Sequence, residues 1–203
     1  MIVIIDYGLG NLNSVLNALT LLGIKAEISR DPEKIKNADK LILPGVGAFK
    51  EGIQNLEKFG LVEVLNNEVL VKKKPILGIC LGMQLFCKKS YEDGEHEGLG
   101  WIDAEVIKFE FKKLRVPHMG WNDVECETTS PLFKGGDKIQ TFYFVHSYYP
   151  LPKDQKIVTG VCNYGIDFCA SFEKENIFAT QFHPEKSQTE GLEILKKFGQ
   201  IKC

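Results

Sequence analysis

The chain has 203 residues, of which 44% are hydrophobic, and this length and composition predict one globular domain spanning residues 1–203. Its formal net charge of −2 gives no basic field that would attract a polyanion, so we expect no nucleic-acid partner. The longest apolar runs, such as residues 2–5, are too short to cross a bilayer, and no basic segment precedes the first run as in a signal peptide, so we expect a cytoplasmic protein without membrane contact.

The first half of the chain alternates between predicted strands and predicted helices. Short apolar segments predict buried strands at residues 2–6, 26–29, 40–45 and 75–80. Helical periodicity or helix start signals occupy residues 11–23, 31–38 and 52–71, and a further helix is expected from Leu81 onward. Because strands and helices alternate, we expect a parallel sheet with helices on both faces and right-handed crossovers.

The second half of the chain is richer in predicted β-structure. Short segments separated by turn residues predict antiparallel strands at residues 104–109, 121–126, 141–149, 157–165, 168–174 and 177–182. One helix, at residues 189–199, is expected to close the chain. The predicted fold class is α/β, with a parallel core sheet flanked by helices and an additional antiparallel β portion.

The cysteines do not form a metal or disulfide pattern. No CxxC motif occurs among the six of them, and their spacings suit neither zinc nor a compact disulfide framework. We therefore expect no bound metal and reduced thiols, most of which are small core residues. Only Cys80 has a local sequence that argues for chemistry.

The stretch PILGICLGMQLF, residues 75–86, places Cys80 on a strand-to-helix turn with a glycine two positions away on each side. A cysteine nucleophile needs a lowered pKa, a base, a group that orients the base, and donors for the oxyanion. The N-terminus of a helix starting at Leu81 favours a thiolate, and the free backbone N–H of Leu81 would be one oxyanion donor. The loop containing Val46 and Gly47 could supply the second donor, because its glycines allow close backbone approach.

A structural reading of the same stretch is equally open. Cys80 could be a packed core thiol, and its glycines could serve only to let strand and helix pack closely. Carboxyl ends of parallel strands are nevertheless where α/β sheets bind ligands, and both Cys80 and the loop at residues 44–47 are expected there.

The base must come from four histidines, and ATQFHPEKS singles out His183. A predicted strand ends just before it, and Glu185, two positions later, can face the same side and hold one imidazole nitrogen. Taken alone, a His-Pro-Glu sequence could also be a surface turn. We expect His118 and His146 to be structural, and His96 to be solvated.

These residues carry a resemblance. GICLGMQ, PGVGAF and QFHPEKS resemble, in order and spacing, the three landmarks of the class I, triad-type glutamine amidotransferases. The resemblance implies a flavodoxin-like fold, with Cys80 as nucleophile, His183 as acid and base, and Glu185 as its orienter. It also implies hydrolysis of L-glutamine through a thioester, without a metal or organic cofactor.

The resemblance further implies that Gln84 lies beside the glutamine substrate. Gln84 is one helical turn from Cys80, so its amide can face the same pocket. An ordinary exposed helix residue is the alternative at this position.

Three other segments resemble one branch of that family. VPHMGWN, YFVHSYY and YGLGNL are similar to the glutaminase subunits of imidazole glycerol phosphate synthase, an enzyme of histidine biosynthesis. The resemblance implies a heterodimer in which a β/α-barrel cyclase subunit uses the ammonia to make imidazole glycerol phosphate and aminoimidazole carboxamide ribotide.

We expect the site to lie at an interface that shields the ammonia, because free ammonia is mostly protonated at neutral pH. The candidate interface residues are Asn11, Trp121, Tyr143 and Lys186. Each has a plainer alternative: Asn11 could cap the first helix, the two aromatic residues could belong to the core, and Lys186 could be a solvated charge.

Rival functions stay open at this point. A paralogous glutaminase could feed ammonia to a different synthase, for example in modified-sugar biosynthesis, and would carry the same motifs. A catalytically silent α/β module that only binds a partner is a second rival, against which the Cys80, His183 and Glu185 set argues. A cysteine hydrolase acting on another substrate is a third, against which Gln84 and the PGVG loop argue.

Overall fold

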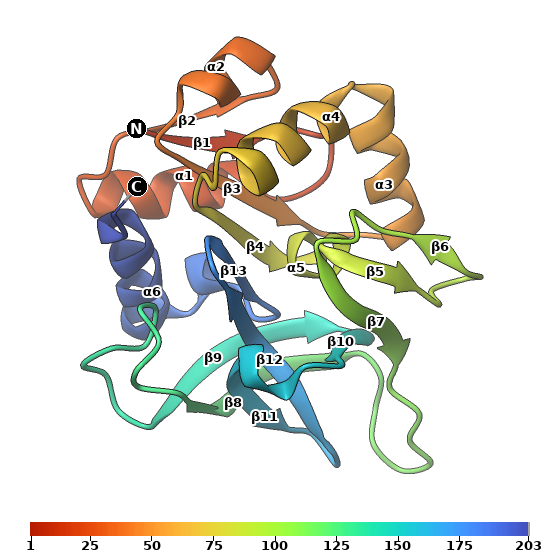
Figure 1. Cartoon of the computed structure of the whole chain (residues 1–203). Coiled ribbons are helices and arrows are strands. Elements are labelled where there is room, and N and C mark those ends of the chain that lie inside the picture. The colour runs from red at the N-terminus through yellow and green to blue at the C-terminus, as the bar shows by residue number, and fades with distance from the viewer. Residues whose placement is uncertain (203) are drawn as a thin grey trace.

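The computed structural model describes residues 1–202 (Figure 1). Its strands are β1 (Ile2–Ile5), β2 (Ala26–Ser29), β3 (Lys40–Gly45), β4 (Ile76–Cys80), β5 (Cys87–Ser90), β6 (His96–Glu97), β7 (Ile102–Lys108), β8 (His118–Cys126), β9 (Ile139–His146), β10 (Tyr148–Pro152), β11 (Val158–Asn163), β12 (Asp167–Lys174) and β13 (Ile177–Thr180). Its α-helices are α1 (Leu12–Leu21), α2 (Pro32–Asn37), α3 (Phe49–Lys58), α4 (Leu61–Asn66), α5 (Leu81–Leu85) and α6 (Gln188–Gln200). Short turns of other helix types are η1 (Asn67–Val71), η2 (Gln155–Ile157) and η3 (Pro184–Lys186).

A nine-stranded sheet forms the centre of the molecule, in the order β2-β1-β3-β4-β13-β12-β11-β8-β9. Strands β2, β1, β3, β4 and β13 are parallel, whereas the pairs from β13 to β9 are antiparallel. The predicted α/β fold with a parallel core and an antiparallel addition is confirmed. The two portions form one continuous sheet, because β13, late in the chain, pairs with β4.

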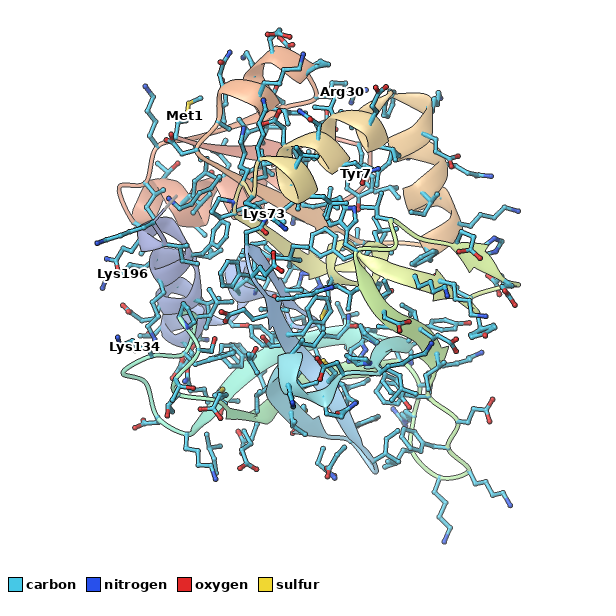
Figure 2. All side chains as sticks on the ribbon, viewed as in Figure 1. Met1, Tyr7, Arg30, Lys73, Lys134 and Lys196 are labelled. Atoms are coloured by element: carbon cyan, nitrogen blue, oxygen red, sulfur yellow. The ribbon has the colours of Figure 1, made fainter. Side chains whose placement is uncertain are left out.

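Alternate residues of the parallel strands face two different hydrophobic layers. On one face, Val3 and Ile5 pack with apolar residues of α2, α3, α4 and α5. On the other, Ile2 and Ile4 pack with apolar residues of α1 and α6. Side chains fill the space between helices and sheet, and Tyr7 lies within this interior (Figure 2). No helix in residues 1–202 is long and apolar enough to span a membrane.

A second, four-stranded sheet has the order β10-β7-β5-β6. The prediction of one strand over residues 141–149 is wrong, because the chain leaves the large sheet after His146 and enters the small one at Tyr148. Both pieces have strand-like sequences, so local pattern does not reveal that they belong to different sheets. The small sheet also contains β5 and β6, which periodicity did not predict.

The predicted helix over residues 52–71 is interrupted. Gly60 has φ +66°, a left-handed conformation that ends α3, and α4 restarts at Leu61. The helix from Leu81 is confirmed but ends at Leu85, because the chain turns into β5 at Cys87.

The glycines around Cys80 clear space for backbone contact. A Cβ on Gly82 would lie 1.7 Å from the carbonyl oxygen of Leu43, so α5 rests directly on β3. A Cβ on Gly78 would lie 2.5 Å from the ring of Phe86 and 2.9 Å from the Gly82 backbone. These glycines allow the strand, the turn and the helix to pack at backbone distance.

We predict that Gly82→Ala destabilises the fold by about 3 kcal/mol or more, because the colliding group is rigid backbone. Gly23→Ala is the matched control, since Gly23 has φ +69° but nothing within 4 Å of its Cβ position, and it should lose only about 1 kcal/mol. Denaturant unfolding measures both changes, and equal losses would contradict the proposed contact.

Candidate active site

Two neighbouring parallel strands bring the predicted nucleophile and base together. Cys80 is the last residue of β4, and His183 follows the end of β13 by three positions. Ile79 pairs with Thr180 in the parallel register, so both strands end at the same edge of the sheet. The site therefore lies beyond the carboxyl ends of the strands, as expected for an open α/β sheet.

Cys80 adopts a strained backbone conformation. Its φ of 53° and ψ of −108° lie outside the regions favoured by non-glycine residues, on the sharp turn between β4 and α5. Its side chain lines the pocket described below, and the residue is 6% exposed. The side-chain amide of Gln181 donates towards its Sγ atom at 3.6 Å.

The imidazole of His183 is held by Glu185. Its Nδ1 atom lies 2.8 Å from the Glu185 Oε1 atom, and the two side chains are 2% and 3% exposed. Because the carboxylate accepts a hydrogen from Nδ1, the Nε2 atom faces away from it, and Nε2 makes no hydrogen bond to another described residue. The structure thus brings Cys80, His183 and Glu185 together.

The backbone of His183 is fixed from two sides. Its N–H donates to the Tyr143 carbonyl at 2.9 Å, and its carbonyl accepts from Ser187 Oγ at 2.6 Å. Ser187 Oγ in turn accepts from the Tyr143 N–H at 3.0 Å. Sequence reasoning missed Ser187, since nothing in a lone serine after η3 indicates that it ties the histidine to β9.

The electrostatics of the site favour a protonated His183. Burial alone would lower the pKa of this imidazole, but the negative charge of Cys80 and the hydrogen bond to Glu185 outweigh it and raise the pKa to about 10. An imidazolium next to a nucleophilic sulfur has a proton ready for a leaving group.

The other four described cysteines are buried thiols whose pKa values are raised. Burial raises the pKa of the Cys87 thiol well above its usual value, and it raises those of Cys126, Cys162 and Cys169 to about 12. All four are buried, which confirms the prediction that they are small core residues. Across residues 1–202, no group of three or more His, Cys, Asp or Glu side chains could hold a metal ion.

A pocket of about 390 Å³ opens above Cys80, a volume suited to a small molecule. Its lining residues are Val46, Gly47, Cys80, Leu81, Gln84, Glu92, Pro117, Val145, His146, Ser147 and Tyr148. The predicted oxyanion-donor segments and the predicted substrate-binding glutamine therefore share one pocket with the thiol.

The orientation of the Gln84 amide follows from its partners. Its Nε2 atom donates to the Tyr148 carbonyl at 2.9 Å and to Gln181 Oε1 at 3.0 Å. Both of its N–H groups are used, so its oxygen is left to accept a hydrogen bond from a molecule in the pocket. The alternative of an exposed helix residue is wrong for Gln84, which is 6% exposed.

Glu92 is a pocket residue that sequence reasoning missed. It follows β5, and its carboxylate accepts from the Phe49 N–H at 2.6 Å. In the sequence it stands in a polar run, YEDGEHEG, where every acidic residue looks equally solvated. Only the short β5–β6 pairing folds that run back over the pocket.

Three of the four predicted interface residues form one surface cluster. Trp121 and Tyr143 are register partners on β8 and β9, with ring centroids 6.0 Å apart, and Lys186 Nζ lies 6.0 Å from the Tyr143 ring. Trp121 is 48% exposed, so the alternative of a core aromatic is wrong for it. Asn11 caps α1 by accepting from the Ser14 N–H, as its plainer alternative has it, and its interface role stays a prediction.

A buried histidine pair lies behind the pocket. His118 and His146 face one another on β8 and β9, with His118 Nδ1 3.0 Å from His146 Nε2. Burial lowers the pKa of His118 to about 4 and that of His146 to about 3. The expectation of structural histidines is consistent with this burial, but the expectation of a solvated His96 is wrong, because its Nε2 atom is buried.

Comparison with known proteins extends the geometric result. A family model described as "Glutamine amidotransferase class-I" matches residues 3–201. The chain is 52% identical to "Imidazole glycerol phosphate synthase subunit HisH 1" of Campylobacter jejuni strain 81-176, over 99% of this chain and 100% of that one. It is 50% identical to "Imidazole glycerol phosphate synthase subunit HisH 2" of Pseudomonas aeruginosa, with the same coverage.

Solved structures show the same fold at low sequence identity. The glutaminase domain of Trypanosoma brucei CTPS with bound acivicin superposes with a TM-score of 0.69 at 17% identity, covering 100% of this chain and 94% of that one. The PurLQS structure from Thermotoga maritima gives a TM-score of 0.74 at 17% identity, covering 97% of this chain and 96% of that one.

We predict that acid destabilises the fold through the histidine pair. The pKa values of about 4 and about 3 lie below the unfolded value near ~6.5, so below that pH the unfolded chain binds more protons and stability falls towards pH 4. His183 acts in the opposite direction near neutral pH, because its raised pKa keeps it protonated in the folded chain while the unfolded chain takes up this proton only near ~6.5. Below about pH 5.5 it is protonated in both states and adds no slope.

Denaturant unfolding between about pH 5.5 and pH 4.5, where His183 adds no slope, measures this effect. The wild type should lose up to about 1.4 kcal/mol per pH unit for each extra proton, and His146→Asn should show a shallower slope. Equal slopes in the two proteins would show that the histidine pair does not titrate as described.

Proposed function

Because the chain belongs to the class I glutamine amidotransferases, we propose that it hydrolyses L-glutamine with Cys80 as the nucleophile. We further propose that the chain delivers the resulting ammonia to a β/α-barrel cyclase subunit of imidazole glycerol phosphate synthase. The observation that supports this most is the shared pocket of Cys80, Gln84 and the PGVG loop, together with the His183–Glu185 pair beside Cys80. The whole chain, residues 1–203, acts in this proposal as one amidotransferase domain.

The first step forms a thioester. The Cys80 sulfur attacks the side-chain amide carbon of glutamine, and the carbonyl oxygen becomes an oxyanion. Leu81 is the first residue of α5, so its backbone N–H has no partner within the helix. This N–H can therefore donate to the oxyanion. The segment of Val46 and Gly47, which lines the same pocket, supplies the second donor.

The second half of the reaction uses His183. Its imidazolium gives a proton to the leaving nitrogen, and ammonia departs as the C–N bond breaks. The neutral imidazole then takes a proton from water, the hydroxyl attacks the thioester, and glutamate leaves as the sulfur is released. Glu185 keeps the imidazole oriented through both transfers.

Substrate recognition combines an acceptor and a charge. The Gln84 oxygen accepts an N–H of glutamine, since both amide hydrogens of Gln84 are already bonded. The Glu92 carboxylate, which lines the same pocket, provides a negative charge for the α-ammonium group. No step requires a metal or an organic cofactor.

The partner interface is proposed on the face that carries Trp121, Tyr143 and Lys186, together with Asn11. Met119, 62% exposed, extends the apolar part of this surface along β8. Large exposed apolar residues beside an aromatic pair are characteristic of a contact surface. The face adjoins His183, whose backbone bonds to Tyr143, so a partner seated there would cover the site and form a heterodimer that holds the ammonia.

A second candidate function differs only in the acceptor. The Campylobacter and Pseudomonas relatives carry the serial numbers HisH 1 and HisH 2, which favours genomes that encode more than one chain of this type. A paralogue of that kind would use the same glutaminase site to supply a different synthase.

We predict that two nitrogen sources separate the roles of the two chains. With the histidine-pathway barrel partner and its ribotide substrate, glutamine should support product formation by the wild type and fail with Cys80→Ala. Ammonium at raised pH should restore product formation with Cys80→Ala, because the acceptor site is on the barrel partner. Cys87→Ala, which removes a buried thiol outside the pocket, is the control and should keep most glutamine-driven activity.

Two results would change the proposal. Failure of ammonium to restore the Cys80→Ala complex, with a barrel partner that is active on ammonium by itself, would overturn the division of labour. Hydrolysis of glutamine without any response of the histidine-pathway barrel would favour the second candidate.

A further inference from the structure

A directed chain of hydrogen bonds joins the buried histidine pair to the pocket. The Asn122 amide lies 3.2 Å from His118 Nε2, and His118 Nδ1 lies 3.0 Å from His146 Nε2. His146 Nδ1 lies 2.8 Å from the Tyr148 carbonyl oxygen. That same oxygen accepts from Gln84, whose amide contacts Gln181, which reaches the Cys80 sulfur.

The direction of each bond is fixed by its ends. A carbonyl oxygen only accepts, so His146 Nδ1 carries the hydrogen, and its Nε2 accepts when the ring is neutral. His118 must then donate from Nδ1 and accept at Nε2 from the Asn122 amide. Asn122 is itself held, since its Nδ2 also donates to the Asn163 carbonyl at 2.9 Å and its Oδ1 accepts from the Asp123 N–H.

This series of hydrogen bonds reaches the pocket where the polypeptide passes from the large sheet to the small one. His146 ends β9 of the large sheet and Tyr148 begins β10 of the small one, so the bond between them spans the single-residue crossover at Ser147. All three residues line the pocket. The Tyr148 carbonyl thus accepts from two side chains, the His146 imidazole and the Gln84 amide, and His146 is the one that belongs to the buried pair.

We propose that the His118–His146 pair positions Gln84 for substrate recognition by fixing the Tyr148 carbonyl that Gln84 donates to. With that carbonyl in place, one Gln84 hydrogen goes to Tyr148 and the other to Gln181, and the oxygen is presented to the bound glutamine. Without it, the Gln84 amide has a free donor and can rotate, which would turn an N–H group towards the substrate's own N–H.

Packing alone does not account for the pair. The rings lie among the apolar and aromatic side chains of Phe109, Phe144, Phe168 and Tyr164, where an apolar residue would avoid the cost of burying polar atoms. The low pKa values keep both rings neutral at physiological pH, which is the state that the bond directions require. Every ring nitrogen of the pair has a partner, so the burial is supported by a complete network.

The test separates substrate recognition from thiol chemistry, and it rests on the proposed glutaminase function. L-Glutamine, which carries the side-chain N–H that Gln84 accepts, is used on the full chain as a competitor of iodoacetamide at Cys80, and the concentration that halves the initial rate of alkylation gives its KI. Iodoacetamide, which needs no pocket, reports the reactivity of the same thiol. His146→Leu should raise KI about tenfold, as expected for loss of one or two hydrogen bonds, and leave the iodoacetamide rate unchanged.

Two further variants identify the cause. His146→Asn keeps an N–H at the position of Nδ1 and should recover most of the affinity. Phe168→Leu removes a ring that packs on both histidines but breaks none of the hydrogen bonds between Asn122 and Cys80. It should therefore lower the free energy of unfolding while KI stays at the wild-type value. If His146→Leu does not fold, His118→Phe tests the preceding bond, and KI should again rise.

An unchanged KI in His146→Leu, or in His118→Phe where that variant is needed, would overturn the inference. An equal rise in Phe168→Leu would also overturn it, since it would show that loss of packing is sufficient. Wild-type chain that reacts with iodoacetamide at Cys80 but is not protected by L-glutamine would contradict the proposed function itself, and this inference with it.

Discussion

The parallel pairing of β4 with β13 is the constraint on which the site depends. The two strands are separated by about half of the chain, yet their register places Ile79 opposite Thr180. This one pairing sets the sulfur of Cys80 and the imidazole of His183 at the same sheet edge, without any special loop. It also joins the antiparallel strands to the parallel core, so the surface around Trp121 lies next to the site.

The strained backbone of Cys80 and the charge of His183 both depend on that strand pairing. The positive φ of Cys80 lifts the thiol out of the strand, and glycines at 78 and 82 let the turn close on β3 at backbone distance. Such a conformation is unfavourable by itself and persists because the surrounding strands over-determine it. The raised pKa of His183 follows from the same closeness, since its burial would otherwise favour the neutral ring.

The sequence allowed the nucleophile, the base and the parallel core to be predicted, because each rests on a local signal. Apolar runs mark buried strands, and two glycines around a cysteine or a histidine before a proline mark the turns that follow. The break at Ser147 was not predictable, because both sides of it have strand propensity. Glu92 and the His118–His146 pair were not predictable either, since their roles depend on β5–β6 and β8–β9 pairing that periodicity does not encode.

The central claim is that glutamine is hydrolysed through a covalent bond to Cys80, and trapping that bond tests it most directly. The chain, together with its barrel partner and the ribotide substrate, is quenched with acid during turnover of L-glutamine, digested with an acid-active protease that cleaves at Leu85 or Phe86, between Cys80 and Cys87, and analysed by mass spectrometry. We predict a γ-glutamyl thioester on the peptide that contains Cys80, and no adduct on the peptides of Cys87, Cys126, Cys162 or Cys169. Glutamate formation without an adduct at Cys80, or with the adduct on another cysteine, would contradict the account.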